Sequence, residues 1–375
     1  MTLPRRALQW VVAAGAAAVA SVVVAPAGAV APATPGASWQ KVPPAAVGLD
    51  AVRLAQIAAQ ARRGKSNCLV VVRDGKLAGE WYFRGTGPGT TQDVFSATKS
   101  VASTLVGIAQ DDGDLRVGDS ASKWIPQWKG TPAEAVTVRD LLSMDSGRQW
   151  SPFTDYVRLL SASDRTAFAI GLDQASAPGR VWAYNNSAVQ TLDRVLLKAT
   201  GQDVLAFAKR RIFAPLGMTH TTMTTDRAGN AQMFEGIRST CRDLARFGLL
   251  MLDRGAWGGR QIVSSSWVAQ ATGRSSTKLN AGYGYLWWLN HEGVISDVLT
   301  ATSLQQAQHA SAGRLVPGAP DDMYWALGLG NQVVQVDPRT KTVVVRLGTA
   351  EPIPTPPTFG PAQASEVVTR AVIRK

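Results

Sequence analysis

Histidine and cysteine are scarce in this chain of 375 residues, which has three of the first and two of the second. A Ser-His-Asp hydrolase needs a histidine base, and no G-x-S-x-G elbow accompanies His220, His291 or His309. A zinc hydrolase typically carries H-E-x-x-H, whereas the "HEGVI" stretch at 291–295 lacks the second histidine. The sequence therefore argues against both kinds of hydrolase, and we expect neither a metal nor a cofactor.

Long runs of charge of one sign are also missing. The net charge is +12, yet no basic run exceeds the "KRR" at 209–211, and no aromatic residues are interleaved with basic ones. Nucleic-acid-binding proteins gather positive charge into a patch or stripe, so we expect no nucleic-acid partner. The composition, with 45% hydrophobic and 18% charged residues, is that of a globular protein and not of a disordered, collagen-like or coiled-coil chain.

Charged residues are absent from residues 7–31, an apolar stretch that follows Arg5 and Arg6 and ends in small residues of the A-x-A type. These features predict a secretory signal peptide over 1–31, a Pro/Ala-rich linker over 32–45, and a secreted protein with no stable membrane anchor after cleavage. A retained membrane anchor is the alternative. The paired arginines leave the choice between general secretory and twin-arginine export open.

Export bears on the interpretation of the two cysteines, Cys68 and Cys241. An even number of cysteines in an oxidising compartment is consistent with a disulfide between them. Two unrelated buried thiols fit equally well, because the sequence does not show whether the two residues are close in space.

Strand-forming residues are concentrated near the two ends of the chain. Residues 67–84 form two β-rich runs joined by Asp74-Gly75, and residues 331–348 form a second pair that turns at Asp337-Pro338. The sequence between them is largely helical, with a clear helix over 240–255.

This distribution predicts an α+β fold, in which one antiparallel β-sheet is flanked by helices and carries an inserted all-α subdomain. We expect one domain over 46–375. Its sheet parts are about 46–95 and 235–375, and its helical part is about 96–234. Apolar spacing in 361–375 predicts a closing helix packed on the sheet.

A serine precedes a lysine by three residues at four places: Ser38/Lys41, Ser120/Lys123, Ser275/Lys278 and Ser96/Lys99. The first pair lies in the predicted linker, where we expect no fixed geometry, and the next two lie in stretches typical of loops and turns. Only Ser96 opens a long helix of apolar periodicity. Residues three apart share one face of a helix, so the amine of Lys99 can approach the Ser96 hydroxyl.

A serine at the start of a helix also lies beside unpaired backbone N–H groups, which can support an oxyanion. These groups and the positive end of the helix dipole also help to lower the pKa of a buried lysine, and a neutral lysine can take the serine proton. Ser96 is therefore a candidate nucleophile and Lys99 a candidate base. The alternative is that Ser96 only caps the helix.

A second polar pair follows in "PGRVWAYNN" at 178–186, directly before another helix. Tyr184 and Asn186 are two residues apart in this loop and can face one cleft. Tyr184 would relay a proton to a leaving group, and Asn186 would orient the lysine and the substrate. The alternative is an ordinary helix N-cap beside an interfacial aromatic residue.

The two motifs in this order resemble the serine β-lactamase and penicillin-binding-protein superfamily. The branch that fits best holds class C β-lactamases, family VIII carboxylesterases and 6-aminohexanoate-dimer hydrolases. The resemblance runs from about residue 46 to 348 through blocks such as "LVVVRDGKLAGEWYFRG", "FSATKSVASTLVGIAQDDGDL", "VTVRDLLSMDSG", "PGRVWAYNN", "STCRDLARFGLLML" and "YGYLWW". It implies a β-lactamase/transpeptidase-like fold.

The resemblance also implies roles for individual residues. It makes Ser96 the acyl-forming nucleophile, Lys99 its general base and Tyr184 the proton relay. Asn186 matches the second polar position of the Tyr-x-Asn element.

The chain departs from the superfamily at the third motif, which is typically Lys-Thr-Gly or His-x-Gly on the strand before the last hairpin. The best match is Ala326-Leu327-Gly328, which offers no cation or hydroxyl to hold a substrate carboxylate. This departure argues against an efficient β-lactamase. The resemblance still places Gly328 and the N–H of Leu329 at the oxyanion hole.

We therefore expect a secreted serine hydrolase that cleaves a small ester or amide through an acyl-enzyme on Ser96. The alternatives are a D-Ala-D-Ala peptidase, a β-lactamase-type enzyme, or a β-lactamase-like binding protein without turnover. The intact set of Ser96, Lys99 and Tyr184 argues against the last alternative, since a binding module needs no activated serine.

Overall fold

The computed structural model describes residues 34–36, 38–296, 310–350 and 358–373. The predicted signal peptide and His309 lie outside these residues. The chain divides into two units, 1–31 and 32–375, and every described element belongs to the second. None of the helices within the described ranges has the length and apolar character that crossing a membrane requires.

The strands of the described part are β1 (Ser66–Arg73), β2 (Lys76–Tyr82), β3 (Gln92–Asp93), β4 (Thr222–Met223), β5 (Ile237–Ser239), β6 (Ala256–Trp257), β7 (Arg260–Gln261), β8 (Trp288–Leu289), β9 (Gly293–Ser296), β10 (Ala310–Gly313), β11 (Tyr324–Gly328), β12 (Gln332–Asp337) and β13 (Thr342–Gly348). The α-helices are α1 (Ala51–Arg63), α2 (Thr98–Asp111), α3 (Val138–Leu142), α4 (Leu159–Ser161), α5 (Arg165–Ile170), α6 (Asn186–Gln190), α7 (Leu192–Thr200), α8 (Val204–Ala208), α9 (Ala214–Leu216), α10 (Cys241–Leu252), α11 (Ser265–Thr272) and α12 (Pro361–Glu366).

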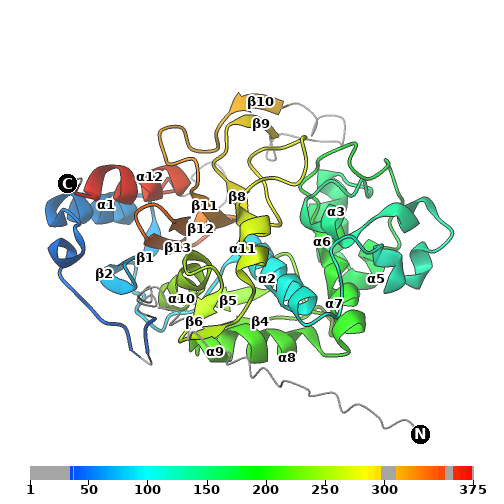
Figure 1. Cartoon of the computed structure of the whole chain (residues 1–375), viewed down its shortest axis with the longest axis horizontal. Helices are drawn as coiled ribbons and strands as arrows, with labels where there is room; N and C mark the ends of the chain where they lie inside the picture. Colours follow the sequence, from blue (N-terminus) through cyan, green and yellow to red (C-terminus); the bar gives the residue numbers. More distant parts are fainter. Residues whose placement is uncertain (1–33, 37, 297–309, 351–357, 374–375) are drawn as a thin grey trace, which may run out of the picture. The chain divides into compact units, whose positions relative to one another are not determined.

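A six-stranded antiparallel sheet has the strand order β2-β1-β13-β12-β11-β8. Its first two strands come from the N-terminal part of the chain and its last four from the C-terminal part, with most of the helices between them in sequence (Figure 1). The α+β fold expected from the sequence is therefore confirmed.

Both predicted hairpins are present in this sheet. Asp74 and Gly75 connect β1 to β2 with φ angles of 49° and 72°, which is the positive-φ geometry that favours an Asp-Gly hairpin turn. The second hairpin joins β12 to β13 through four residues after Asp337, so its turn is longer than the two residues that the sequence suggested.

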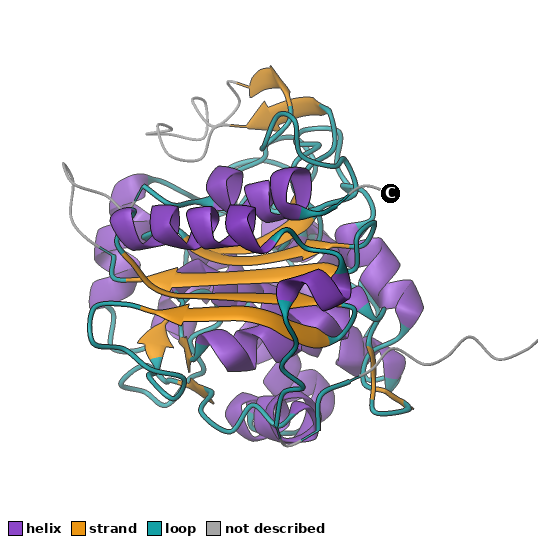
Figure 2. Ribbon diagram, turned by 90° about the vertical axis from the view of Figure 1, so that its left-hand side faces the viewer, coloured by secondary structure: helices purple, strands orange, loops and turns teal. Residues whose placement is uncertain are grey.

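The strands of the sheet are apolar on both faces because both faces are covered. In β13, Val343 and Val345 belong to one hydrophobic core and Val344 belongs to the other, as the two-residue period of a strand requires. Helices α1 and α12 cross one face, in front of the strands in Figure 2, and α10 and α2 pack against the opposite face. Both predicted helices, over 240–255 and near the C-terminus, thus pack on the sheet.

The described residues of the predicted linker, 34–36 and 38–45, make defined contacts, whereas the sequence suggested no fixed geometry there. Trp39 is buried, and the Arg246 guanidinium of α10 lies 5.3 Å from its ring. Arg246 also donates hydrogen bonds to the carbonyl oxygens of Pro35 (3.4 Å) and Gly36 (2.9 Å). The sequence did not indicate this contact, because Trp39 lies among prolines and alanines and its partner Arg246 is some two hundred residues away in the sequence.

Residues 40–42 continue this stretch along the outer edge of β2. The N–H of Leu77 donates to the carbonyl of Gln40 (2.9 Å), and the N–H of Val42 donates to the carbonyl of Leu77 (3.0 Å). The side chain of Lys41 forms an ion pair with Glu80 of the same strand (2.7 Å). These contacts occupy backbone groups that an edge strand otherwise leaves unpaired.

A disulfide joins Cys68 of β1 to Cys241, the first residue of α10. Both residues are buried, and Thr240 caps the same helix by accepting a hydrogen bond from the N–H of Asp243 (3.1 Å). The start of α10 is therefore fixed to the sheet by a covalent bond and by its cap.

Helix α2 is enclosed on all sides, since every residue from Thr98 to Ala109 is buried. It passes against α11 at Gly107, where an added Cβ would lie 2.5 Å from ring atoms of Trp267. A glycine at this helical position thus gives the indole room to pack, and α2 becomes a fixed support for the residues at its N-terminus.

Candidate active site

Ser96 lies in a short 3-10 turn, Phe95–Ala97, that leads directly into α2. We expected Ser96 to open the α-helix itself, but α2 begins two residues later, at Thr98. The reason is the backbone of Phe95, whose φ of 47° is unusual for a bulky residue and redirects the chain immediately before the serine. Ser96 is partly exposed, whereas the residues that follow it are buried.

Two strands hold the residues around Ser96. The N–H of Val94 donates to the carbonyl of Ile237 in β5 (3.0 Å), and the N–H of Ile237 donates to the hydroxyl of Thr98 (3.0 Å). On the other side, the end of β11 approaches so closely that a Cβ on Gly328 would lie 2.1 Å from the Val94 carbonyl oxygen. Only glycine allows this approach, which brings the end of β11 to the turn that carries Ser96.

The amine of Lys99 contacts Ser96. Its Nζ lies 2.8 Å from the Ser96 hydroxyl oxygen and 3.2 Å from the carbonyl oxygen of Phe234. The side chain is 1% exposed, and burial lowers the pKa of Lys99 to about 7. A substantial fraction of this amine is therefore neutral near pH 7 and is placed to accept a proton from the serine.

Two carboxylates act on Lys99 from a distance and oppose this shift of its pKa, Glu235 and Asp155. Each has other partners. Glu235 forms an ion pair with Arg165 (2.8 Å). Asp155 is fully buried and accepts hydrogen bonds from the N–H of Asn186 (2.5 Å) and from the hydroxyl of Ser187 (2.6 Å). Burial also raises the pKa of Asp155 to about 6. At Lys99, the loss of hydration lowers the pKa by more than the two carboxylates raise it.

Tyr184 stands beside both members of the Ser-Lys pair. The Lys99 amine lies 4.6 Å from the centre of the Tyr184 ring, and the ring of Tyr283 meets the Tyr184 ring edge to face with the two centres 6.0 Å apart. The indole N–H of Trp150 donates to the Tyr184 carbonyl oxygen (3.0 Å), which fixes the backbone there. Burial raises the pKa of Tyr184 well above its usual range, so the phenol keeps its proton at neutral pH.

Asn185 and Asn186 have separate tasks. Asn185 is the N-cap of α6: its side-chain oxygen accepts from the N–H of Ala188 (2.8 Å) and its amide donates to the carbonyl of Arg148 (3.2 Å). The capping role that the sequence left open therefore falls on Asn185. Asn186 is 3% exposed, and its side-chain oxygen has no hydrogen-bond partner among the described residues.

The end of β11 carries the residues that match the third motif. Ala326 is buried, Gly328 is the last residue of the strand, and Leu329 is 67% exposed. The strand end formed by Ala326-Leu327-Gly328 is apolar and lies beside the turn that carries Ser96. The sequence predicted that neither a cation nor a hydroxyl would be present there.

In the other three Ser-x-x-Lys pairs, at least one member has a different partner, and Lys41 forms an ion pair with Glu80 (2.7 Å). Ser120 caps a short turn and donates to the carbonyl of Glu134 (2.6 Å), while Lys123 pairs with Asp119 (3.2 Å). Ser275 accepts from the N–H of Thr277 (3.3 Å). In the fourth pair, the serine and the lysine are hydrogen-bonded to each other, with Lys99 Nζ 2.8 Å from the Ser96 hydroxyl oxygen.

Asp155 and Tyr283 belong to this site, and the sequence did not single them out. The "YGYLWW" block that contains Tyr283 was visible as a matching block, but nothing in it indicated a contact with Tyr184. Asp155 had no signal, since a lone carboxylate in a loop is ordinary. Within the described residues, no group of three or more His, Cys, Asp or Glu side chains is placed to hold a metal ion.

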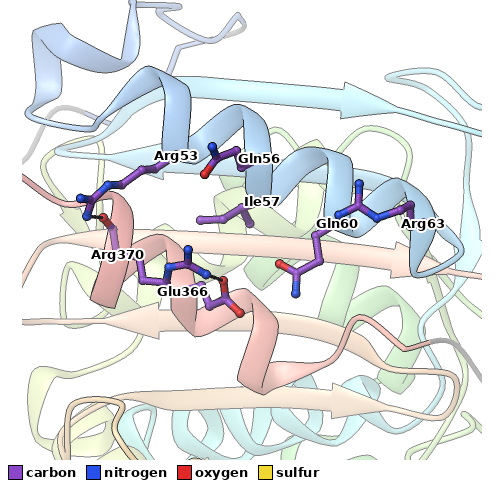
Figure 3. Close-up of a pocket in the computed structure, with 7 residues that line it drawn as sticks. All are labelled: Arg53, Gln56, Ile57, Gln60, Arg63, Glu366 and Arg370. Atoms are coloured by element: carbon purple, nitrogen blue, oxygen red, sulfur yellow. Dashed lines mark hydrogen bonds and ion pairs between the residues drawn. The ribbon is translucent and has the colours of Figure 1, made fainter.

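A pocket of about 220 Å³ lies between α1 and the C-terminal helix (Figure 3). Its lining residues are Arg53, Gln56, Ile57, Gln60, Arg63, Glu366 and Arg370. These elements cover the sheet face opposite to the one on which Ser96 and Tyr184 lie, so this pocket is separate from the serine site.

Comparisons with known proteins agree with this geometry. Residues 53–367 match the family model described as Beta-lactamase. The 6-aminohexanoate-dimer hydrolase of Paenarthrobacter ureafaciens is 22% identical over 80% of this chain and 77% of its own length.

Two solved structures have the same fold. A family VIII carboxylesterase covers 89% of this chain and 99% of its own, with a TM-score of 0.66 and 14% identity. A class C beta-lactamase in complex with cefoxitin covers 87% and 98%, with a TM-score of 0.61 and 16% identity.

Proposed function

The chain belongs to the beta-lactamase family, whose members are serine hydrolases, and we propose that it cleaves a small ester or amide through an acyl-enzyme on Ser96. The observation that carries this proposal is the 2.8 Å contact between the Ser96 hydroxyl and a buried Lys99 amine beside the Tyr184 phenol. An activated serine of this kind is the arrangement that nucleophilic catalysis needs.

Acylation follows from the positions of these groups. The neutral Lys99 amine takes the Ser96 proton as the serine oxygen attacks the substrate carbonyl carbon. The N–H groups of Ser96 and Leu329 bind the oxyanion, supported by the close approach of Gly328 to Val94. Tyr184 then gives its proton to the leaving group as the bond to the carbonyl carbon breaks, and the Lys99 ammonium returns a proton to Tyr184. A water molecule attacks the acyl-enzyme in the second half of the reaction.

The substrate is proposed to be a small ester or amide without a carboxylate that the enzyme must recognise. Ala326 supplies no positive charge at the end of β11, and exposed Leu329 adds an apolar surface there. The free side-chain oxygen of Asn186 suits a substrate N–H, which would serve an amide. The relatives named above, a 6-aminohexanoate-dimer hydrolase and a family VIII carboxylesterase, support both substrate classes.

Export is part of the proposal. The apolar stretch between Arg6 and the small residues near 31 supports a signal peptide. The disulfide between Cys68 and Cys241 supports the same conclusion, because such bonds persist in oxidising compartments. Mass analysis of the mature N-terminus after expression in an exporting host tests this point, and an intact Met1 in the exported fraction would contradict it.

A fluorophosphonate probe and p-nitrophenyl acetate test the chemistry. We expect the probe to label Ser96 and the ester to be hydrolysed, and we expect both activities to be lost in Ser96→Ala. Ser120→Ala is the matched control, because Ser120 also precedes a lysine by three residues but caps a surface turn. Wild-type protein that shows neither labelling nor turnover would overturn the proposed function.

A further inference from the structure

A short turn connects β11 to β12, directly after the strand end that lies beside the reactive serine. The turn consists of Leu329, Gly330 and Asn331. Gly330 and Asn331 have positive φ angles of 75° and 59°, the left-handed geometry that tight turns between antiparallel strands use. The first residue of the turn, Leu329, is the one whose N–H is proposed to bind the oxyanion.

The carbonyl oxygen of each turn residue accepts a hydrogen bond from a buried side chain. The side-chain amide of Gln332 donates to the carbonyl oxygen of Leu329 (3.0 Å). The guanidinium of Arg346 donates to the carbonyl oxygens of Gly330 (2.6 Å) and Asn331 (2.8 Å). Both donor side chains are 0% exposed, so the carbonyl oxygens of the turn are held from inside the protein.

Gln332 is itself fixed by a neighbouring strand. Its amide nitrogen also donates to the carbonyl oxygen of Gly348 at the end of β13 (2.6 Å), and its side-chain oxygen accepts from the N–H of Gly348 (2.9 Å). A glutamine amide has two N–H donors, and both are used here. The Leu329 carbonyl is thus connected to the end of a central strand through one side chain.

Arg346 is fixed as well. Its Nε donates to the hydroxyl of Ser66 (2.8 Å), and its Nη2 donates to the carbonyl oxygen of Lys65 (3.1 Å). Burial lowers the pKa of Arg346 to about 10, so the guanidinium remains charged at neutral pH. Because hydrogen bonds from a charged donor are stronger than neutral ones, the second half of the turn is held firmly in place.

We propose that Gln332 is a positioning residue for the oxyanion hole, which fixes the direction of the Leu329 N–H by holding the carbonyl oxygen of the same residue. This inference rests on the proposed function. Leu329 is restrained on both sides, because Gly328 before it lies against the Val94 carbonyl oxygen and its own carbonyl is held by Gln332. The Leu329 N–H can turn away from the reacting carbonyl only if one of these contacts is lost. A donor that is fixed before the reaction stabilises the oxyanion without reorganisation.

An ester and its thiono analogue separate this role from a general loss of structure. The transition state of p-nitrophenyl acetate places negative charge on oxygen, and that of p-nitrophenyl thionoacetate places it on sulfur, a weak hydrogen-bond acceptor. We expect Gln332→Met to lower kcat/KM for the oxygen ester by about tenfold to a hundredfold, somewhat less than the loss of an oxyanion-hole donor. For the thionoester, kcat/KM should stay within a factor of about three of wild type. The ratio of the two values does not depend on the fraction of enzyme that is folded.

Gln335→Met is the matched control. Gln335 is also fully buried in β12, but the two-residue period of a strand places it on the other face of the sheet, where it accepts from the indole N–H of Trp325 (3.0 Å). Each variant loses the hydrogen bonds of a buried glutamine, and melting temperatures report the loss of stability. The ratio of the two kcat/KM values should change for Gln332→Met alone. Should Gln332→Met give no soluble protein, Gln332→Asn, whose amide is one methylene shorter, replaces it in the same comparison.

Three outcomes would each overturn the inference while leaving the serine hydrolase intact. They are equal losses on both esters, no loss on either, and the same change of ratio in Gln335→Met. Wild-type protein with no turnover of either ester and no fluorophosphonate label on Ser96 would instead overturn the proposed function itself.

Discussion

At the scale of single residues, the site depends on the burial of Lys99. An amine that is 1% exposed loses hydration that a surface lysine keeps, and its pKa falls to about 7. Phe234 accepts one hydrogen bond from it and Ser96 lies on its other side. Because burial lowers the pKa of Lys99, part of the amine is neutral near pH 7 and can act as the base.

The pH dependence of acylation follows from this pKa. Lys99 is mostly charged below pH 7 and mostly neutral above it, and only the neutral form accepts the Ser96 proton. We therefore expect kcat/KM for p-nitrophenyl acetate to fall about tenfold for each pH unit below about 7 and to level off above it. A pH profile between 5 and 9 at constant ionic strength measures this, and a flat profile would contradict a titrating base at Lys99.

Replacement of the lysine adds a second test at the same scale. Lys99→Arg keeps the positive charge, and an arginine does not release its proton at any working pH. We therefore expect kcat/KM to fall by about a hundredfold or more. Lys123→Arg is the control, because Lys123 occupies the same spacing after Ser120 and pairs with Asp119 on the surface. Fluorophosphonate labelling at pH 8 compares the two variants, and equal labelling would exclude Lys99 as the base.

At the scale of elements, α2 is the support on which the serine and the lysine stand. It is buried along nearly its whole length, and a Cβ added at Gly107 would lie 2.5 Å from the Trp267 ring of α11. Positions where two helices approach this closely have no space for a side chain. We therefore expect a change of packing at this contact to disturb α2, which carries Lys99 and directly follows the turn of Ser96.

Gly107→Ala tests this packing. The new methyl group would lie 2.5 Å from the Trp267 ring, so the indole or the helix must move, and we expect a loss of about 1–3 kcal/mol in the free energy of unfolding. Gly118→Ala is the control, because a Cβ at Gly118 meets nothing within 4 Å. Denaturant unfolding of both variants measures the difference, and a Gly107→Ala protein as stable as wild type would show that the contact relaxes without cost.

The same scale shows which elements the sequence predicted and why. Asp74-Gly75 predicted a hairpin because the turn is chosen by two adjacent residues, and the pattern over 240–255 predicted α10 because helix signals are local. Ser96 was selected from four serines by the apolar period of the helix after it. In each case the information lies within a few residues of the feature.

The features that the sequence did not predict depend on distant partners. Tyr283 and Asp155 reach Tyr184 and Asn186 only after the sheet and the helical part have folded together. Phe95 has a positive φ and follows Val94, which contacts both β5 and β11, and α2 starts at Thr98 instead of at Ser96. Trp39 lay in a stretch whose composition suggests a linker, and its burial depends on Arg246.

At the scale of the whole molecule, one covalent bond connects the two halves of the sequence that build the sheet. Cys68 and Cys241 are separated by 173 residues in the chain. A link that closes so long a loop restricts the unfolded chain strongly in the chain-entropy account. The bond also connects β1 to α10, which packs on the same face as the serine site.

Removal of the disulfide should destabilise the protein without changing its reaction. For the double variant Cys68→Ala/Cys241→Ala we expect a loss of about 2–5 kcal/mol in the free energy of unfolding. Dithiothreitol should lower the melting temperature of wild type towards that of the variant and should not affect the variant. Two free thiols per chain in denatured, non-reduced protein would contradict the disulfide.

The strand-like stretch at residues 40–42 has a consequence for handling the protein. A chain that began after Val42 would lose the backbone partners of Leu77 and the ion pair to Glu80, so β2 would present an open edge. Open edges pair with one another between molecules and promote aggregation. Recombinant protein made without the proposed signal peptide should therefore begin at or before Thr34, where the contacts of Pro35 and Gly36 with Arg246 are also kept.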